Sequence, residues 1–535
     1  MADLLVRARV VDGTGAPGFG GWVAVRAGRV AAVGRESEPA PVAAVVVDRP
    51  DLVVAPGFVD VHSHADLSAV LAPGLDSAVA QGITTVVVGN CGISPAPLPA
   101  RTSAADLVHA WLGAPAPGGV PDVAWQGFGE FLDVVEQARP AVNVAALAGF
   151  GALRRAVLDD TDRPARRDEV RRMRDLLARC LDEGAAGMST GLIYDPDRSA
   201  PTAEVVEVAR ALRGRGRYAT HLRAEGRLLW EALDEAFRIG RAAGVPVQVS
   251  HLKLEGRSMW GGATELLGRI RAARTGGLEV GADHYPYAAY ETSLEAFFPV
   301  WAPHGRLGDL LADPREAARL RRAVEEGKPG WQSSVDDVGW DRVVVTRHRD
   351  QVAVGLSLAE IAEATADGDG FAAACSLLVA DPACGVVGHA MAESDVRVLA
   401  QASDVAVCTD SVAAPGAGWL AAVEGHPRGW GSFPRVLGRY VREQGLLGLE
   451  AAVARMTSLP ASQFGLDGAG GRGTLAPGMA ADLVLLDPAS VADRADYLDP
   501  RRPPAGIELV LVNGLPAADP HALVGAGGTH GRVLR

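Results

Sequence analysis

Short apolar runs rich in β-branched residues alternate with helical patterns through the middle of the chain. This alternation is typical of parallel strands joined by crossover helices. Two of the intervening segments, 165–183 and 228–243, repeat apolar positions at spacings of three and four and carry charges on the other face. Eight parallel strands close a barrel, so we predict an α/β fold built on a (β/α)8 TIM-like barrel. The eight apolar runs are 52–64, 84–91, 142–150, 185–191, 218–224, 245–253, 278–286 and 405–411.

The two ends of the chain differ from the middle. Residues 4–11, 22–33, 481–486 and 507–512 alternate apolar and polar positions in the manner of antiparallel strands. We therefore expect residues 1–55 and 468–535 to form one small β-sandwich domain, and residues 56–467 to form the barrel. The long interval after the seventh run predicts an insertion at about 290–380, placed as a lid over the barrel mouth. The Gly/Pro-rich residues 113–121 are typical of a surface loop.

Composition and charge narrow the possible functions. The 535 residues are 48% hydrophobic and 22% charged, which suits a globular enzyme, and the net charge of -13 without a sustained Lys/Arg run argues against nucleic acid or an anionic membrane as partner. The N-terminus lacks a signal-peptide pattern and no apolar run reaches spanning length, so we expect a cytoplasmic protein. Five cysteines without a Cys-x-x-Cys pair make disulfides and zinc knuckles poor expectations. Oligomeric state cannot be read from the sequence.

Polar residues recur where the predicted strands end. His62 and His64 are two positions apart at the end of the first strand, so both imidazoles point the same way. Taken alone, a His-x-His pair is more often a surface or capping pair. The carboxyl ends of barrel strands meet at one face, however, and chemistry is assembled there, so this face predicts a metal site. The residues at strand ends are His62, His64, Cys91, His221, His251, Lys253, Asp283, Tyr285 and Asp410.

Several long segments resemble the amidohydrolase superfamily and, within it, the N-acyl-D-amino-acid deacylases, also called D-aminoacylases. The resemblance covers nearly the whole chain. The fourth predicted strand, AAGMSTGLIYDP, has no lysine, whereas many relatives bridge two metals with a carboxylated lysine on this strand. The segments that carry the resemblance are APGFVDVHSHAD, QGITTVVVGNCGISPAP, MSTGLIYDP, YATHLRAEG, VSHLKLEG, DHYPY, CTDS, HPRGWGSFPRVLGRYVRE and LAPGMAADLVLLDP.

The resemblance implies a zinc ion held by Cys91, His221 and His251, with His62 and His64 completing a second, weaker metal position that shares Cys91. A thiolate and two imidazoles suit zinc and leave one coordination position open for water. Without the resemblance, Cys91 would be read as a small buried hydrophobe.

The resemblance also makes Asp410 the general base. Asp410 would take a proton from the zinc-activated water and then deliver it to the departing amine. Without the resemblance, Asp410 would be read as a turn or helix-capping residue.

The resemblance further implies that Lys253, Tyr285, Tyr194 and Arg428 bind the substrate carboxylate, although each residue alone would usually be a solvated cation or a half-buried aromatic. The chain departs from the family pattern at Gly149-Phe150-Gly151 and around Tyr290-Glu291-Thr292. Residues 292–298 contain no arginine to pair with an acidic substrate side chain. We therefore predict neutral or apolar D-amino-acid side chains in preference to D-Glu or D-Asp. Glu291 or Glu295 could instead favour a basic side chain.

Three functions follow from these patterns. The first is zinc-dependent hydrolysis of N-acyl-D-amino acids to a carboxylate and a free D-amino acid. The second is a cyclic-amide hydrolase of the dihydroorotase or hydantoinase kind, which would usually need the lysine missing from strand four. The third is a non-catalytic binding protein on the same barrel. Asp410 beside an open metal position argues against the third.

Overall fold

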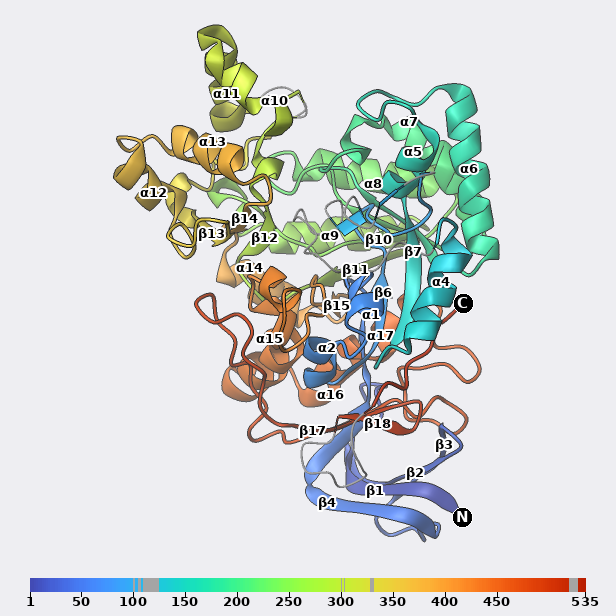
Figure 1. Ribbon diagram of the computed structural model, residues 1–535. Coiled ribbons are helices and arrows are strands. Elements are labelled where there is room, and N and C mark those ends of the chain that lie inside the picture. Colours follow the sequence, from blue (N-terminus) through green and yellow to red (C-terminus); the bar gives the residue numbers. More distant parts are fainter. Residues whose placement is uncertain are drawn as a thin grey trace.

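The computed structural model describes residues 1–99, 102–103, 107–108, 125–299, 301–302, 304–327, 332–518 and 528–535. The expected surface loop at 113–121 lies outside these residues. Figure 1 shows a central body of strands and helices, a sheet at the end that holds the N-terminus, and a group of helices, α10 to α13, on the opposite side.

The eight expected barrel strands are all present as one parallel sheet, in chain order. The expected run 52–64 divides in two at Gly57, because Pro56 ends a strand of the small sheet before the barrel strand begins. A side chain at Gly57 would lie 2.3 Å from Thr84, so only glycine allows this close approach of the two strands. The barrel strands are β5 (Phe58–Asp60), β6 (Ile83–Val88), β7 (Asn143–Gly149), β8 (Gly187–Gly191), β9 (Arg217–His221), β10 (Val247–Val249), β11 (Val280–His284) and β15 (Ala406–Val407).

The barrel closes just beyond the ends of its first and last strands. The Asp410 amide donates to the His62 carbonyl at 2.8 Å, and the His64 amide donates to the Ser411 carbonyl at 2.7 Å. The interior is filled by small and branched side chains, among them Val59, Val87, Leu147, Ala219 and Ala406. The barrel is therefore a packed core, and its chemistry must be assembled at the strand ends.

Helices surround the barrel, and their apolar faces join its largest hydrophobic cluster. The expected helices at 165–183 and 228–243 are confirmed as α6 and α8. The helices are α1 (Ser68–Leu71), α2 (Asp76–Ala80), α4 (Phe128–Ala138), α5 (Phe150–Val157), α6 (Arg167–Asp182), α7 (Thr202–Ala209), α8 (Leu229–Ala243), α9 (Ala263–Thr275), α14 (Glu393–Gln401), α15 (Arg428–Arg435), which continues as a π-helix over Val436–Glu443, α16 (Leu449–Met456) and α17 (Ser458–Gln463).

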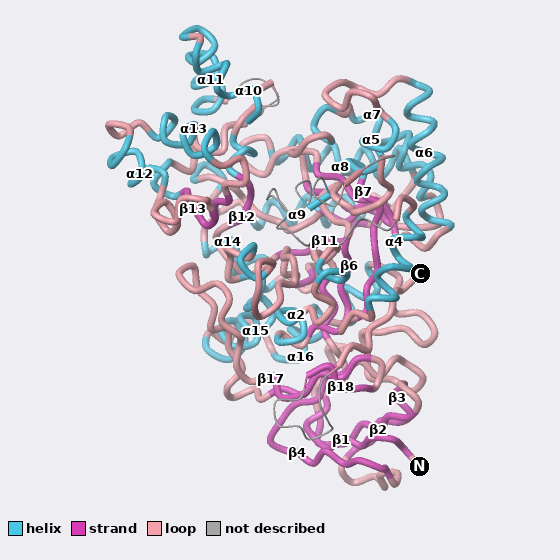
Figure 2. The backbone as a smooth tube through the Cα atoms, viewed as in Figure 1, coloured by secondary structure: helices cyan, strands magenta, loops and turns pink. Residues whose placement is uncertain are grey.

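Both ends of the chain contribute to one seven-stranded sheet, as expected, and Figure 2 shows its strands gathered below the barrel. The expected strand at 22–33 is instead a hairpin, because Ala27 and Gly28 take positive φ and turn the chain between β2 and β3. Residues from both ends share one hydrophobic cluster, so the sheet encloses its own core. Its strands are β1 (Ala2–Val10), β2 (Phe19–Arg26), β3 (Arg29–Arg35), β4 (Ala43–Pro56), β16 (Leu483–Leu486), β17 (Ile507–Val512) and β18 (Leu515–Ala518).

The insertion after β11 has its own antiparallel sheet and hydrophobic cluster. Tyr285, Tyr287 and Cys408 belong to this cluster, so the insertion packs against the ends of the seventh and eighth barrel strands. Its elements are β12 (Tyr290–Ser293), α10 (His304–Ala312), α11 (Pro314–Glu326), β13 (Val343–Arg347), α12 (Leu358–Thr365), α13 (Gly370–Ala380) and β14 (Gly385–Gly388).

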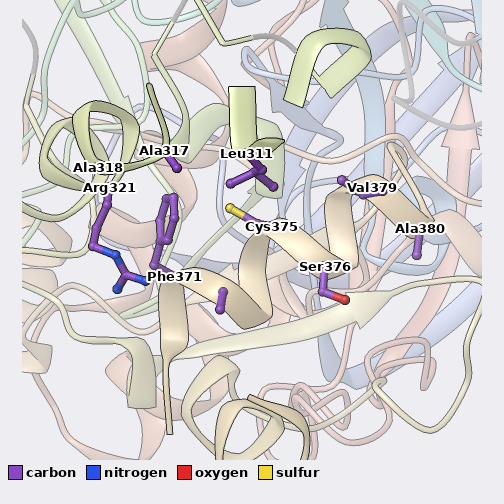
Figure 3. A pocket seen from close by; sticks show the side chains of 10 residues that line it. Leu311, Ala317, Ala318, Arg321, Phe371, Cys375, Ser376, Val379 and Ala380 are labelled. Atoms are coloured by element: carbon purple, nitrogen blue, oxygen red, sulfur yellow. The ribbon is translucent and has the colours of Figure 1, made fainter. Parts of the chain in front are cut away.

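A cavity of about 730 Å³ lies among the insertion helices, lined by apolar side chains such as Leu311, Phe371 and Val379, with Arg321 at its edge (Figure 3). None of the strand-end residues lines this cavity. Among the described helices, none combines the length and the apolar character needed to cross a bilayer.

Candidate metal centre and active site

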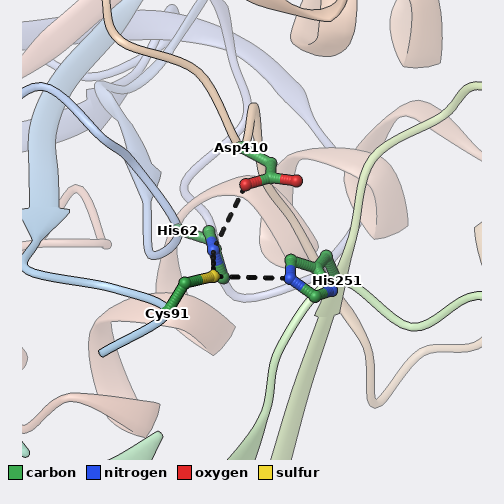
Figure 4. Close-up of side chains that lie close together, drawn as sticks. All are labelled: His62, Cys91, His251 and Asp410. Carbon is green, nitrogen blue, oxygen red and sulfur yellow. Dashed lines mark hydrogen bonds and ion pairs between the residues drawn. The ribbon is translucent and has the colours of Figure 1, made fainter. Parts of the chain in front are cut away.

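Four of the predicted ligands converge beyond the strand ends. The Cys91 Sγ atom lies 3.3 Å from His62 Nε2, 3.5 Å from His251 Nε2 and 3.7 Å from His221 Nδ1. Asp410 joins the group because its Oδ1 atom is 3.3 Å from His62 Nε2. Figure 4 shows the side chains of His62, Cys91, His251 and Asp410 pointing toward one another. All five residues are buried.

These spacings fit a zinc ion. Zinc–sulfur and zinc–nitrogen bonds of about 2.3 and 2.0 Å in a tetrahedron place the donor atoms about 3.5 Å apart. The three distances from the Cys91 sulfur span that value. Burial raises the pKa of the Cys91 thiol well above its ordinary value, so binding zinc must displace a proton from it. Burial lowers the pKa of His221, and lowers that of His251 to about 3, so both imidazoles are neutral and can coordinate.

His64 contacts the centre differently. Its Nε2 atom is 3.2 Å from Asp410 Oδ1, and its ring meets that of His62 edge-on at 5.5 Å. Its side chain is 18% exposed, while that of His62 is fully buried. His64 therefore joins the centre through Asp410 and His62, on its more accessible side.

Glu225 is the main residue that sequence reasoning missed. Its carboxylate faces His221 Nε2 at 3.1 Å and His251 Nδ1 at 3.2 Å, and it accepts hydrogen bonds from Lys253 Nζ at 2.8 and 2.9 Å. Burial would raise the pKa of Glu225, but His221, Lys253 and His251 hold it well below its ordinary value. The only signal was its place four residues after His221, and spacing alone does not show that the loop returns to two imidazoles.

Asp283 faces a ring nitrogen of His62, as Glu225 faces those of His221 and His251. Its Oδ1 atom is 3.4 Å from His62 Nδ1 and accepts the His251 backbone N–H at 2.7 Å, while Gln248 donates to its other oxygen. Carboxylates behind metal-binding histidines fix the ring orientation and the position of the ring hydrogen. Glu225 and Asp283 therefore turn one ring nitrogen of each histidine toward Cys91.

Three residues of the centre have strained backbones. Cys91, His251 and Asp410 take φ values of 54°, 33° and 53°, in the left-handed region that non-glycine residues rarely adopt. Each such residue costs on the order of 1–3 kcal/mol, and such strain collects at functional sites. Hydrogen bonds hold these turns, including Asp410 N–H to the His62 carbonyl and His251 N–H to Asp283. The strain turns the side chains inward from the strand ends.

The predicted carboxylate-binding residues lie beside the centre. Arg428, the first residue of α15, donates from Nη1 to Asp410 Oδ2 at 2.7 Å, and its guanidinium lies 4.8 Å from the centre of the Tyr285 ring. Lys253 Nζ is 5.7 Å from the same ring and 2.7 Å from His251 Nδ1. The Tyr194 ring meets His221 edge-on at 4.8 Å. The structure thus gathers all four residues, with both cations already paired to carboxylates.

The charge around Asp410 favours its ionised form. Burial would raise the pKa of Asp410, but Arg428, His251 and His62 hold it well below its ordinary value. Burial raises the pKa of Tyr285 well above its ordinary value, so its hydroxyl remains a donor. The site combines neutral imidazoles, an ionised carboxylate and buried hydrogen-bond donors, a set suited to metal-assisted hydrolysis.

Comparisons with known proteins find relatives over nearly the whole chain. The sequence profile of the amidohydrolase family matches residues 45–311 and 390–518, leaving out much of the insertion. The chain is 37% identical to a D-aminoacylase of Alcaligenes xylosoxydans xylosoxydans over 99% of this chain and 97% of that protein.

Several solved structures resemble the whole chain, including the following two. One is of a D-aminoacylase whose binuclear metal centre is described as having one-metal activation and second-metal attenuation, with 35% identity, a TM-score of 0.81 and full coverage of both chains. The other is of an N-acyl-D-glutamate deacylase from Bordetella bronchiseptica with zinc and a phosphonate inhibitor, with 36% identity, a TM-score of 0.80 and coverage of 100% and 99%. The chain belongs to the amidohydrolase family.

Proposed function

We propose that the protein is a zinc-dependent hydrolase that cleaves the amide bond of N-acyl-D-amino acids, releasing a carboxylate and a free D-amino acid. The observation that carries this proposal is the Cys91 sulfur among three imidazole nitrogens at zinc-like spacing, with Asp410 beside it. The names of the similar proteins support it, since they are a D-aminoacylase and an N-acyl-D-glutamate deacylase.

For the metals, we assign the tight zinc site to Cys91, His221 and His251. His62 and His64 would complete a second, weaker position that shares Cys91. The greater exposure of His64, and its contact with Asp410, suit a weaker site. When bound, zinc supplies Lewis-acid polarisation of the substrate carbonyl and makes water a nucleophile near neutral pH.

Asp410 is the residue that moves the proton in this proposal. Its Oδ1 atom accepts a proton from the attacking water and later donates it to the amine nitrogen as the C–N bond breaks. Its low pKa leaves it ionised and ready to accept that proton. The buried position of Asp410 excludes bulk water from competing for the transfer.

The substrate α-carboxylate is placed against Arg428, Tyr285, Lys253 and Tyr194. Arg428 Nε and the Tyr285 hydroxyl are buried and have no hydrogen-bond partner among the described residues. Buried donors without a partner are costly, and a substrate carboxylate would satisfy both. Lys253 adds positive charge, and Tyr194 bounds the site next to His221.

Neutral or hydrophobic D-amino-acid side chains are the proposed substrates. Residues 292–298 contain no arginine, and both buried cations of the site already face carboxylates, Glu225 and Asp410. Glu291 accepts from the Gly425 N–H at 3.1 Å and adds further negative charge near Arg428. An acidic substrate side chain would therefore enter an already acidic region.

The test is free-amine release by zinc-loaded protein from matched N-acetyl-D and N-acetyl-L amino acids. We expect release from the D series only, reduced by about 10²- to 10⁴-fold in Asp410→Asn, the usual contribution of a general base. No release from either series, with zinc bound stoichiometrically, would exclude this function and direct attention to cyclic amides.

A cytoplasmic location is part of the proposal. All five cysteines are free thiols and all are buried. Such unpaired thiols are typical of a reducing compartment.

A further inference from the structure

We propose that Arg428 positions the Asp410 carboxylate in addition to binding the substrate, so that one guanidinium bridges the substrate α-carboxylate and the base. This inference rests on the proposed function and extends it. It follows that the residue that binds the substrate α-carboxylate also affects kcat.

The first observation is that the two oxygens of Asp410 have different partners. Oδ1 faces the imidazoles of His64 and His62 at 3.2 and 3.3 Å. Oδ2 accepts the hydrogen bond from Arg428 Nη1 at 2.7 Å. A charge-assisted bond of this length is strong, and a carboxylate held at one oxygen cannot rotate freely about its Cβ–Cγ bond. Arg428 therefore fixes the orientation of the carboxylate, with one oxygen held by the guanidinium and the other directed toward the metal centre.

The second observation is that Arg428 is itself held in place. Its backbone N–H donates to His426 Nδ1 at 3.0 Å, and His426 Nε2 lies 3.0 Å from the Ala289 carbonyl between β11 and β12. The guanidinium lies over the Tyr285 ring, and the residue is 6% exposed. The arginine is thus a fixed support for Asp410, anchored to the start of α15 and to the residues after β11.

The third observation is that part of the guanidinium has no partner. Arg428 Nε is buried without a hydrogen-bond partner among the described residues, while Nη1 is taken by Asp410. A planar guanidinium has five N–H donors on separate edges, so it can bind Asp410 on one edge and a second carboxylate on the edge that includes Nε. Lysine, with a compact ammonium group, cannot reproduce both contacts in the same geometry.

The inference separates two effects of removing Arg428. A residue that only binds substrate would change the Michaelis constant and leave turnover at saturation unaltered. A residue that also orients Asp410 would lower kcat, and would do so even for a substrate without a carboxylate. Misplacing a reacting group by about 1 Å can cost on the order of 100-fold in rate.

The experiment compares zinc-loaded wild type, Arg428→Met and Arg428→Lys on N-acetyl-D-leucine and on N-acetyl-D-leucinamide. Arg435→Met is the control, since Arg435 is on the same helix and pairs with Asp493. We expect kcat for the acid to fall about 100-fold in both Arg428 variants, and turnover of the amide to fall by a similar factor. Arg435→Met should keep kcat within about twofold. In Arg428→Met, low millimolar guanidinium should restore part of kcat.

Other outcomes are decisive as well. A raised Michaelis constant with unchanged kcat, or amide turnover equal to that of wild type, would overturn the positioning role and leave the proposed function standing. If wild type releases no amine from any N-acyl-D-amino acid, the proposed function fails separately. Crystal structures of wild type and Arg428→Met then decide the positioning role: a rotated or displaced Asp410 carboxylate supports it, and an unmoved one overturns it.

Discussion

Replacing Glu225 by Gln tests whether the residues behind the imidazoles set the metal affinity. Glutamine keeps the size of the side chain but changes one oxygen into an NH₂ donor. The Glu225 carboxylate receives Lys253 and faces one ring nitrogen of His221 and one of His251. All of these neighbours present hydrogens to Glu225 when the opposite ring nitrogens bind metal. The new NH₂ group must therefore face at least one other donor.

The expected magnitude follows from these contacts. Loss of a residue that orients one metal-binding histidine typically costs 10- to 100-fold in metal affinity. Glu225 orients two of the three assigned zinc ligands, so we expect the upper end, about 100-fold, which is about 2.7 kcal/mol. The change also leaves the buried Lys253 ammonium without its counter-ion, and breaking a buried pair typically costs about 3–5 kcal/mol of folding stability.

The assay is a zinc titration in competition with a chelator of known affinity, alongside thermal unfolding of the zinc-loaded protein. Glu235→Gln is the matched control, because Glu235 is also buried and pairs with Arg223 on a neighbouring part of the chain. The control should lose stability and keep its zinc affinity. The reasoning is refuted if Glu225→Gln binds zinc within about twofold of wild type, or if Glu235→Gln weakens zinc binding equally.

Three further predictions concern the thiol, a buried acid and specificity. Zinc binding should release a proton from Cys91, since burial raises the pKa of its thiol, and a pH-indicator dye would detect that proton. Cys91→Ala should lose stoichiometric zinc; an unchanged zinc content by metal analysis contradicts the ligand assignment. Burial raises the pKa of Glu424 from 4.5 to about 8, so the folded protein keeps a proton that the unfolded chain releases, and stability falls as pH rises through this interval. The Tm of Glu424→Gln should therefore exceed that of wild type by more at pH 8 than at pH 5. An equal Tm difference at the two pH values would contradict the raised pKa of Glu424. N-acetyl-D-glutamine should have a higher kcat/KM than N-acetyl-D-glutamate. Glu291→Gln should reduce the ratio of these two kcat/KM values about tenfold, which corresponds to the removal of about 1.4 kcal/mol of repulsion. Equal changes in kcat/KM for both substrates would show that Glu291 does not act through charge.

The barrel was predictable because the signals that specify it are local. Each strand is a short apolar run, and each long helix repeats its apolar positions, so order and number could be read along the chain. The boundaries at Gly57 and at Ala27–Gly28 could not, because they depend on the approach of a second strand and on positive φ. At Gly57 the nearest obstacle is Thr84, a residue of the next barrel strand.

The candidate site shows the same division between local and long-range information. His62, Cys91, His221, His251 and Asp410 lie at the ends of strands or just beyond them, so the barrel alone predicts that they share a face. Their mutual distances depend on turns in which Cys91, His251 and Asp410 adopt positive φ. Non-glycine residues adopt positive φ only occasionally, so these residue types alone do not predict the turns.

The residues that hold those turns and orient the imidazoles come from distant parts of the chain. Glu225 binds Lys253 from 28 positions away, and Arg428 binds Asp410 from 18 positions away. The family resemblance assigned Lys253 and Arg428 to the substrate carboxylate, an anion that both cations suit. In the folded chain each cation already has a carboxylate of its own. In the proposed function, a substrate anion therefore enters an existing ion-pair network, which would couple its binding to the positions of Asp410 and of the assigned metal ligands.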